Sequence, residues 1–511
     1  MLTVAMDGHS LGLDPLMDIA RRGARVVIAD SAKPRIEGSR QVVDAALRQG
    51  RAVYGVTTGF GKFSDTVIGR TQAETLQRNL ILSHATGVGD YLSEDVVRAA
   101  LALRINALCK GYSGIRLTTL ETLAEMLNRG VVPAIPEKGS LGASGDLAPL
   151  SHLCSVLIGS GEAWYEGRLL PGMKAMESAG LSPVTLQAKE GLALINGTQV
   201  MTAIGCLALH DAEVLAKTAD IASMLSFESL RGIPAAYSSR IVDVRSHPGA
   251  AKTAANLRRL VEGSSLATAP GELRVQDAYS LRCIPQVHGA SKDAMAHVRT
   301  VLELEINSAT DNPLVFAGAP EDEEILSGGN FHGQPVALAM DYLGIAVAEL
   351  ANISERRIER LVNPQLSGLP AFLTRAGGLN SGLMIVQYTA AALVSENKIL
   401  AHPASVDSIP SSANQEDHVS MGTIGARKAK EIIWNTSEVI ALELLTAAQA
   451  MEFHGKELLG RGSRAVYDLI RKHVDPLEND RFMRADIAAV ERLVRAGEIV
   501  TVVESVLGEL E

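Results

Sequence analysis

Large apolar residues recur at every third or fourth position over long stretches in the second half of this chain. That spacing is typical of one face of an α-helix, and it predicts helices over residues 199–226, 287–309, 334–361 and 421–453. A shorter helix is predicted over 93–110. Roughly 28 residues between 334 and 361 would form a rod about 40 Å long at the helical rise of 1.5 Å per residue. Several of these helices exceed the usual length in globular proteins.

The predicted helix over 334–361 is apolar on nearly every side near its N-terminal end, where alanines alternate with larger aliphatic residues. A helix that is apolar all round is normally buried. Asp341, Glu349 and the charged run 355–357 interrupt it too often for a membrane span, so we expect no membrane association. The pattern predicts a bundle of long helices, completed by other subunits.

The first 200 residues have a different pattern, because short helical segments alternate there with glycine-rich turns. We therefore predict a mainly α protein with a smaller N-terminal domain over 1–200 and a central long-helix bundle over 201–455. Residues 456–511 are more polar and are predicted to form a C-terminal helical appendage. Asn-Pro pairs at 312–313 and 363–364 are natural helix stops.

Composition excludes several classes of protein. Of the 511 residues 47% are apolar but only 4% are aromatic, which favours close-packed helices over a β-sandwich. The 48 basic and 58 acidic residues give a net charge of −10 with no basic run, so nucleic-acid binding is not expected. No signal peptide is evident. The four cysteines are far apart, and no histidines have zinc-site spacing, so we expect a cytoplasmic protein without a metal.

The tripeptide Ala143-Ser144-Gly145 indicates unusual chemistry. The amide nitrogen of Gly145 can attack the carbonyl carbon of Ala143, since glycine reaches the necessary conformation at little cost. Loss of water closes an imidazolone ring, and loss of a second water from Ser144 leaves an exocyclic C=CH2 group. The product is an electrophile that ordinary side chains do not supply. The alternative is a glycine-rich loop whose serine caps a helix.

The longer string around this tripeptide, residues 139–152, reads GSLGASGDLAPLSH. It resembles the signature of the histidine ammonia-lyase family, aromatic amino acid ammonia-lyases that form 4-methylideneimidazole-5-one from such a triplet. The resemblance extends over residues 50–455. It implies an ammonia-lyase fold, a homotetramer whose sites draw on more than one subunit, and no external cofactor. Asp146 either assists the cyclisation or only begins a helix.

An ammonia-lyase must anchor the substrate carboxylate, and the segment 276–282 provides candidates. Arg282 can bind a carboxylate with two parallel hydrogen bonds, and Tyr279 would share a helix face with it. Taken alone, the pair is better explained as an ordinary surface arginine beside a half-buried tyrosine. The resemblance implies that Gln276, Tyr279 and Arg282 line the substrate pocket, with Arg282 on the carboxylate.

The resemblance also assigns Tyr54, at the start of a glycine-rich loop, to an active-site lid. Tyr54 is the expected base for the β-proton, with Tyr279 as the other candidate. Because the ordinary pKa of tyrosine is about 10, positive surroundings would have to stabilise the phenolate. Asn196 either hydrogen-bonds the new ring's carbonyl or the substrate amine, or caps the next helix. Phe331 is expected to form a pocket wall.

The substrate is indicated by His84 and Glu416. A histidine and a carboxylate can bind an imidazole ring, which has both donor and acceptor nitrogens, whereas a phenyl ring would leave both without partners. Family members acting on phenylalanine or tyrosine differ at these positions. The resemblance thus implies conversion of L-histidine into trans-urocanate and ammonia. The alternatives are a phenylalanine or tyrosine ammonia-lyase, a 2,3-aminomutase with the same prosthetic group, and a non-catalytic scaffold.

Overall fold

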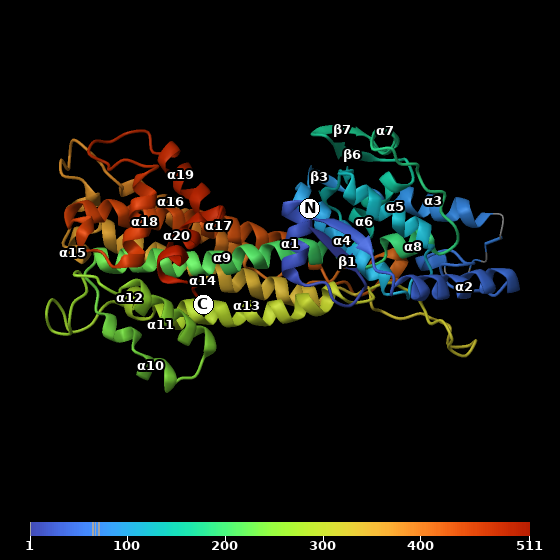
Figure 1. The fold of residues 1–511 in the computed structure, drawn as a ribbon, viewed down its shortest axis with the longest axis horizontal. Coiled ribbons are helices and arrows are strands. Elements are labelled where there is room, and N and C mark those ends of the chain that lie inside the picture. The colour runs from blue at the N-terminus through green and yellow to red at the C-terminus, as the bar shows by residue number, and fades with distance from the viewer. Residues whose placement is uncertain (1, 64–65, 67, 70–71) are drawn as a thin grey trace. The chain divides into compact units, whose positions relative to one another are not determined.

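The computed structural model describes residues 2–63, 66, 68–69 and 72–511, and the chain divides into two compact units. The first unit contains residues 1–207, 300–340 and 403–427, and the second contains 208–299, 341–402 and 428–511. Helices dominate both units (Figure 1). The three consecutive segments expected from the sequence differ from this arrangement, because each unit is assembled from segments that are distant along the chain.

The first unit is built around short helices and small sheets. The helices are listed here with their bounds: α1 (Leu13–Arg22), α2 (Lys33–Gln49), α3 (Ala73–His84), α4 (Glu94–Cys109), α5 (Leu117–Asn128), α6 (Leu147–Leu157), α7 (Gly172–Ser178) and α8 (Glu190–Ile195). Its strands are β1 (Thr3–Met6), β2 (Arg25–Ile28), β3 (Val88–Tyr91), β4 (Val132–Pro133), β5 (Pro136–Lys138), β6 (Glu162–Tyr165), β7 (Arg168–Pro171), β8 (Leu314–Val315) and β9 (Ile325–Leu326). Among the strands of the described residues only β1 and β2 pair in parallel, and the largest sheet there has three strands, in the order β4-β6-β7.

Helix α4 forms the centre of the first unit, because every residue from Val96 to Cys109 is buried. It packs against α1 and α5, while α3 packs against α6 and α8. Three polar residues, Arg98, Arg104 and Asn106, lie in this otherwise apolar stretch. A buried arginine needs partners for its guanidinium. One partner of Arg104 is the backbone carbonyl of Asn196, a predicted site residue.

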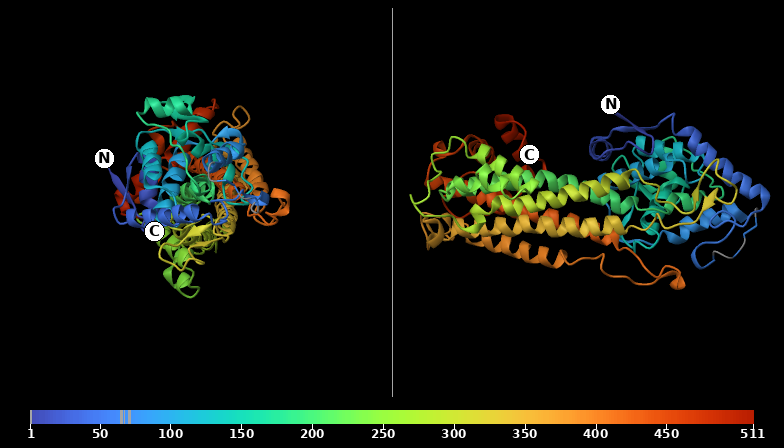
Figure 2. Two further views of the ribbon diagram at one scale, coloured as in Figure 1. Left: turned by 90° about the vertical axis from the view of Figure 1, so that its right-hand side faces the viewer. Right: turned by 90° about the horizontal axis from the view of Figure 1, so that it is seen from below.

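Four long helices form the framework of the second unit: α9 (Gln199–Ser229), α13 (Ile284–Ile306), α14 (Gln334–Val362) and α17 (Gly422–Ala450). They run side by side in the views of Figures 1 and 2, which confirms the predicted long-helix fold. The shorter helices of this unit are α10 (Ser239–Asp243), α11 (Pro248–Leu260), α12 (Tyr279–Arg282), α15 (Pro364–Ser367), α16 (Met384–Leu400), α18 (Arg461–Arg471), α19 (Arg484–Arg495) and α20 (Glu498–Leu507).

The predicted helix boundaries agree closely for α14 and less well for α13. Helix α14 ends at Val362, directly before the Asn363-Pro364 stop. Helix α13 begins three residues earlier than expected because Pro285 lies in its first turn, where proline is well tolerated. By length and composition α14 alone among the described helices is long and apolar enough to cross a membrane, yet 67% of its most apolar stretch is buried within the protein.

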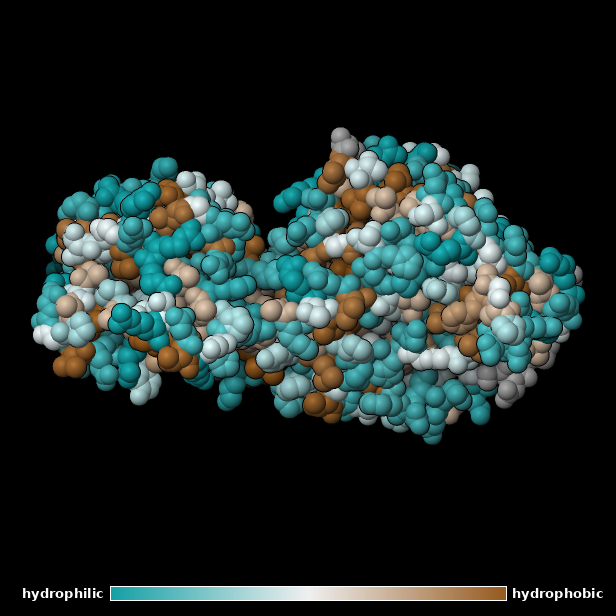
Figure 3. Space-filling view, turned by 60° about the horizontal axis from the view of Figure 1, so that its bottom comes forward, coloured by the Kyte–Doolittle hydropathy of each residue, from teal (hydrophilic) through white to brown (hydrophobic). Residues whose placement is uncertain are grey.

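Helix α16 has an unusual surface for a helix of a single chain. It is rich in apolar residues, yet only Val386, Ala390 and Asn397 are buried. Ile385 and Ile399 are 58% and 73% exposed. Apolar side chains are also visible at the surface among hydrophilic ones (Figure 3).

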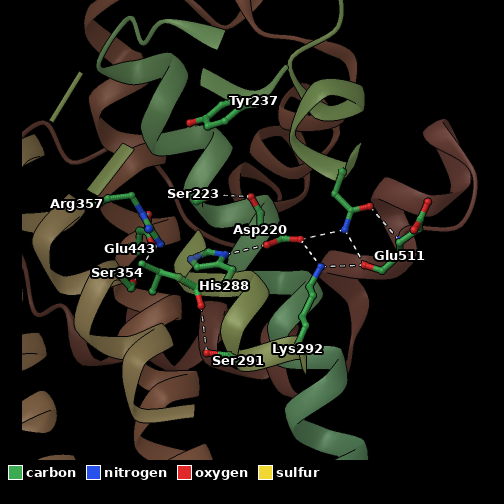
Figure 4. A network of polar contacts seen from close by, with 12 residues as sticks. Asp220, Ser223, Tyr237, His288, Ser291, Lys292, Ser354, Arg357, Glu443 and Glu511 are labelled. Atoms are coloured by element: carbon green, nitrogen blue, oxygen red, sulfur yellow. Dashed lines mark hydrogen bonds and ion pairs between the residues drawn. The ribbon is translucent and has the colours of Figure 1, made fainter. Parts of the chain in front are cut away.

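A network of buried polar contacts joins the long helices of the second unit (Figure 4). Asp220 of α9 accepts hydrogen bonds from Nδ1 of His288 at 2.8 Å and from Nζ of Lys292 at 2.7 Å, both on α13. Arg357 of α14 donates to Glu443 of α17, with Nη2 at 2.8 Å from one carboxylate oxygen. Because removing one partner would leave a buried charge unpaired, the network fixes these helices in register.

Candidate functional site

The Ala143-Ser144-Gly145 triplet lies in the loop between β5 and α6, packed against the loop that precedes α9. Gly145 has a φ of +70°, and a Cβ at this position would lie 2.1 Å from the carbonyl oxygen of Gly197. Only glycine fits there. The amide of Asp146 donates to the same oxygen at 2.7 Å. The second loop thus packs directly against the triplet and leaves no room for a side chain at position 145.

The carboxylate of Asp146 is fully buried and connects the triplet to two helix N-termini. It accepts hydrogen bonds from the amides of Val200 and Met201 at 2.9 and 2.8 Å, in the first turn of α9. It also accepts from the hydroxyls of Ser140, at 3.0 Å, and Thr423, in the first turn of α17. Burial raises the pKa of Asp146, and these hydrogen bonds oppose the shift. Asp146 therefore caps α9 rather than the helix that directly follows it.

Asn196 contacts the triplet directly. Its Nδ2 donates to the carbonyl oxygen of Ser144 at 3.0 Å, the oxygen that would become the ring carbonyl after cyclisation. The backbone carbonyl of Asn196 accepts from Nη1 of the buried Arg104 at 2.8 Å. Of the two roles considered for Asn196, the structure shows the contact with the triplet.

A cavity of about 1080 Å³ opens beside the triplet in the first unit. It brings together six of the predicted site residues, which are Tyr54, His84, Ser144, Asn196, Phe331 and Glu416. A second hollow of about 220 Å³ lies over the triplet itself and is lined by Ala143 and Gly145, together with Ser83, His84 and Glu416. Residues separated by more than 300 positions in the sequence thus converge on Ser144.

Glu416 contacts the triplet directly. One carboxylate oxygen accepts from the Ser144 hydroxyl at 3.1 Å, and the other accepts from the Ser411 hydroxyl at 3.0 Å. His84, at the C-terminal end of α3, faces the same cavity. Burial lowers the pKa of His84, although the Leu80 carbonyl and the Glu416 charge act in the opposite direction. His84 is therefore neutral at pH 7.

Tyr54 also faces this cavity, but its surroundings favour the neutral phenol. Its hydroxyl oxygen accepts a hydrogen bond from the amide of Gly61 at 3.3 Å, and its ring meets Phe60 edge-on. Burial raises the pKa of Tyr54, the Glu416 charge raises it further, and the Gly61 amide lowers it. The positive surroundings that a phenolate requires are not supplied by these neighbours.

The remaining predicted residues, Gln276, Tyr279 and Arg282, belong to the second unit. Tyr279 and Arg282 form one turn of helix, α12, and the guanidinium lies 4.5 Å from the centre of the tyrosine ring. The expected shared face is therefore present. Tyr279 is 71% exposed, and none of the three is among the residues that line the two cavities of the first unit. Their contact with substrate stays a prediction.

The loop that carries Glu416 is backbone-strained, and the sequence analysis missed it. Ser412, Ala413 and Asn414 have consecutive φ values of +52°, +54° and +67°, a left-handed conformation that is unfavourable for non-glycine residues. Ser411 and Glu416 close the loop by exchanging backbone hydrogen bonds. No glycine marks the turn, so the pattern gave no signal. Arg104 was also missed, although an arginine within an apolar helix is a recognisable signal of a buried polar contact.

Comparison with known proteins gives a consistent family. Residues 11–472 match the family described as aromatic amino acid lyase. The chain is 60% identical over 504 residues to a histidine ammonia-lyase of Alkaliphilus oremlandii, with 99% of each chain covered. The same identity and coverage hold for a histidine ammonia-lyase of Symbiobacterium thermophilum.

Solved structures extend the similarity to proteins with a different name. The crystal structure of histidine ammonia-lyase from Trypanosoma cruzi superposes with a TM-score of 0.92 at 45% identity, covering 99% of this chain and 96% of that one. Tyrosine aminomutase from Streptomyces globisporus superposes with a TM-score of 0.96 at 40% identity, covering both chains completely. The backbone alone therefore does not separate the two activities, and the site residues must do so.

Proposed function

Because the chain belongs to the aromatic amino acid lyase family, we propose that it is a histidine ammonia-lyase, which converts L-histidine into trans-urocanate and ammonia. One observation carries the choice of substrate: His84 and Glu416 line the same cavity as the Ser144 triplet. Both are hydrogen-bonding groups suited to imidazole nitrogens. Curated relatives at 60% identity that bear this name support the proposal.

The residues around the triplet fit the prosthetic group 4-methylideneimidazole-5-one. Gly145 has a left-handed conformation, and its backbone packs against the carbonyl of Gly197, where no side chain fits. Asn196 already donates to the Ser144 carbonyl oxygen, and would hold the same oxygen in the ring. The Ser144 hydroxyl faces the cavity, where its loss would leave the alkene open to substrate. Once formed, the group supplies an electrophilic carbon that makes the substrate amine a better leaving group.

The chain's own residues then bind and orient the substrate. His84 and Glu416 hold the imidazole ring, Phe331 walls the cavity, and Arg282 binds the carboxylate through its planar guanidinium. Tyr54 takes the β-proton, with Tyr279 as the alternative base. Since burial and Glu416 both raise the pKa of Tyr54, a nearby cation is needed for the phenolate to form, and Arg282 is a suitable one.

The assembly we propose is a homotetramer. Helix α16 exposes a row of apolar side chains that a single chain does not cover, and burial of such a surface is the main force in permanent association. Tyr279 and Arg282 are exposed or half-buried in the second unit. A neighbouring copy would place these residues in the cavity of another subunit.

An aromatic ammonia-lyase or aminomutase is the second candidate, because tyrosine aminomutase has the same fold. Against it, a phenyl or phenol ring would leave His84 and Glu416 desolvated with unsatisfied hydrogen-bonding capacity. Each such group costs about 1–3 kcal/mol, and the two together would disfavour the phenyl substrate by more than tenfold.

The test is to follow the absorbance of urocanate as it appears from L-histidine without added cofactor, with phenylalanine and tyrosine as controls. Intact-mass measurement of the same sample should give a chain two waters lighter than its sequence. Turnover of tyrosine or phenylalanine without turnover of histidine would overturn the assignment of substrate. An unshortened mass in active enzyme would overturn the prosthetic group.

A further inference from the structure

At the end of helix α3, a series of hydrogen bonds connects the backbone to the ring of His84. The hydroxyl of Ser83 lies 3.1 Å from the carbonyl oxygen of Leu80 and 3.0 Å from Nδ1 of His84. Ser83 also lines both cavities beside the triplet. No role in the reaction has been given to Ser83 so far.

The donors in this series can be assigned by counting hydrogens. A carbonyl oxygen only accepts, so the single hydroxyl hydrogen of Ser83 is used in the bond to Leu80. With that hydrogen directed at Leu80, the Ser83 oxygen accepts from His84, and we therefore assign the hydrogen of the ring to Nδ1. The Leu80 carbonyl acts in the same direction, since it raises the pKa of His84 through its own hydrogen bond to the ring.

A neutral imidazole carries one hydrogen on its two nitrogens. Because burial lowers the pKa of His84, the ring is neutral at pH 7, and a hydrogen on Nδ1 leaves Nε2 with a lone pair. This tautomer follows from the hydrogen-bond partners. His84 therefore presents an acceptor to a ligand. Glu416 lines the same end of the cavity, and a carboxylate also only accepts.

We propose that Ser83 is a positioning residue that holds His84 in the Nδ1–H form, so that the cavity selects a substrate ring with N–H donors on both nitrogens. This inference rests on the proposed function and specifies the bound form of the substrate. The imidazolium cation has two N–H donors and satisfies both His84 and Glu416, whereas neutral imidazole satisfies one of them. A positively charged ring also withdraws electrons from the β-carbon, which makes the β-proton easier to remove.

The test uses two ligands that differ only in the ring, 3-(imidazol-4-yl)propionate and 3-(2-thienyl)propionate, as competitive inhibitors of histidine turnover. Calorimetry at pH 8 in buffers of different ionisation enthalpy measures proton uptake on binding. We expect about one proton taken up per site with the imidazole ligand, because its ordinary pKa is near 6.5, and none with the thienyl ligand.

Variants of Ser83 separate a positioning role from a structural one. Ser83→Ala should weaken the imidazole ligand about tenfold and reduce its proton uptake, with little change for the thienyl ligand. Ser83→Thr retains the hydroxyl and should restore both values. Binding of the imidazole ligand to the wild type without proton uptake would overturn the proposed bound form. Equal weakening of both ligands in Ser83→Ala, or no weakening, would overturn the role of Ser83.

These outcomes are distinct from failure of the proposed function. If the wild-type enzyme does not convert histidine into urocanate, the function itself is wrong, and the inference about Ser83 falls with it. If histidine is converted and the imidazole ligand does not inhibit, the cavity does not bind the ring as we propose. In that case only the inference about Ser83 is refuted.

Discussion

Replacement of Asn196 by alanine should separate folding from catalysis. The side chain is only 3% exposed, and it donates to the Ser144 carbonyl oxygen at 3.0 Å. As a neutral hydrogen bond within the fold, this contact contributes roughly 1 kcal/mol to stability. In the proposed prosthetic group the same oxygen would belong to the electrophile, where negative charge develops in the reaction. A donor placed at such an oxygen contributes about 2.7–4 kcal/mol, or about 10²–10³ in kcat.

The expected result for Asn196→Ala is therefore a small loss of stability with a loss of kcat of at least a hundredfold (roughly 10²). Urocanate formation measures kcat, urea unfolding measures stability, and intact mass shows whether the triplet has lost two waters. Asn106→Ala is the matched control. Asn106 is also buried and donates to a backbone carbonyl, that of Ile306, at 3.0 Å, but it is not among the residues that line the cavities.

We expect Asn106→Ala to lose at least as much stability as Asn196→Ala while kcat stays within about threefold of the wild type. The reasoning is refuted if a fully matured Asn196→Ala enzyme retains a tenth or more of the wild-type kcat. It is also refuted if the triplet of this variant does not mature at all, because the contact would then serve ring formation rather than the finished group.

Three further predictions concern single side chains. Ser144→Ala should fold like the wild type by circular dichroism, show no loss of water in its intact mass, and lose nearly all activity; normal turnover would exclude the proposed electrophile. Lys189→Met should lower the free energy of unfolding, measured in urea, by about 3–5 kcal/mol, because Lys189 pairs with Asp311 at 2.7 Å with both side chains buried. The Lys189→Met, Asp311→Leu double variant should regain part of this stability, since it removes the unpaired carboxylate. Burial lowers the pKa of His288, so the unfolded chain binds a proton there at a pH where the folded chain does not. The stability linked to neutral His288 is complete above about pH 6.5 and is lost as the pH falls. The urea midpoint should therefore change less steeply with pH, between pH 7.5 and 5, in His288→Gln than in the wild type. The same pH dependence in both proteins would contradict this.

The periodicity of apolar residues predicted the long helices because it is a local property of the chain. Helix α14 was predicted over 334–361 and is observed over Gln334–Val362, since both its apolar face and its Asn-Pro stop are visible in a short window. The grouping of segments was not predictable in this way. Residues 300–340 and 403–427 join the N-terminal segment through contacts such as that of Thr423 with Asp146, which span hundreds of positions.

The candidate residues were predicted individually, whereas the contacts between them were not. The motif around Ser144 identified the triplet, but nothing local shows that Asp146 caps a helix starting at Gln199. The donor to Ser144 was foreseen only as one of two roles for Asn196. Ser411 and the left-handed turn after it carried no signal, because the strain at residues 412–414 is imposed by long-range packing rather than by glycine or proline.

The two groups that we propose to select an imidazole ring lie on these less predictable elements. His84 ends helix α3, where Ser83 and the Leu80 carbonyl hold its ring. Glu416 is held by Ser411 at the end of the strained turn. Each group is held by a neighbouring hydroxyl, of Ser83 or Ser411, that also lines the hollow over the triplet. Because Ser411 and the left-handed turn place the side chain at position 416 beside Ser144, we expect a change of substrate on this fold to require more than exchange of His84 and Glu416.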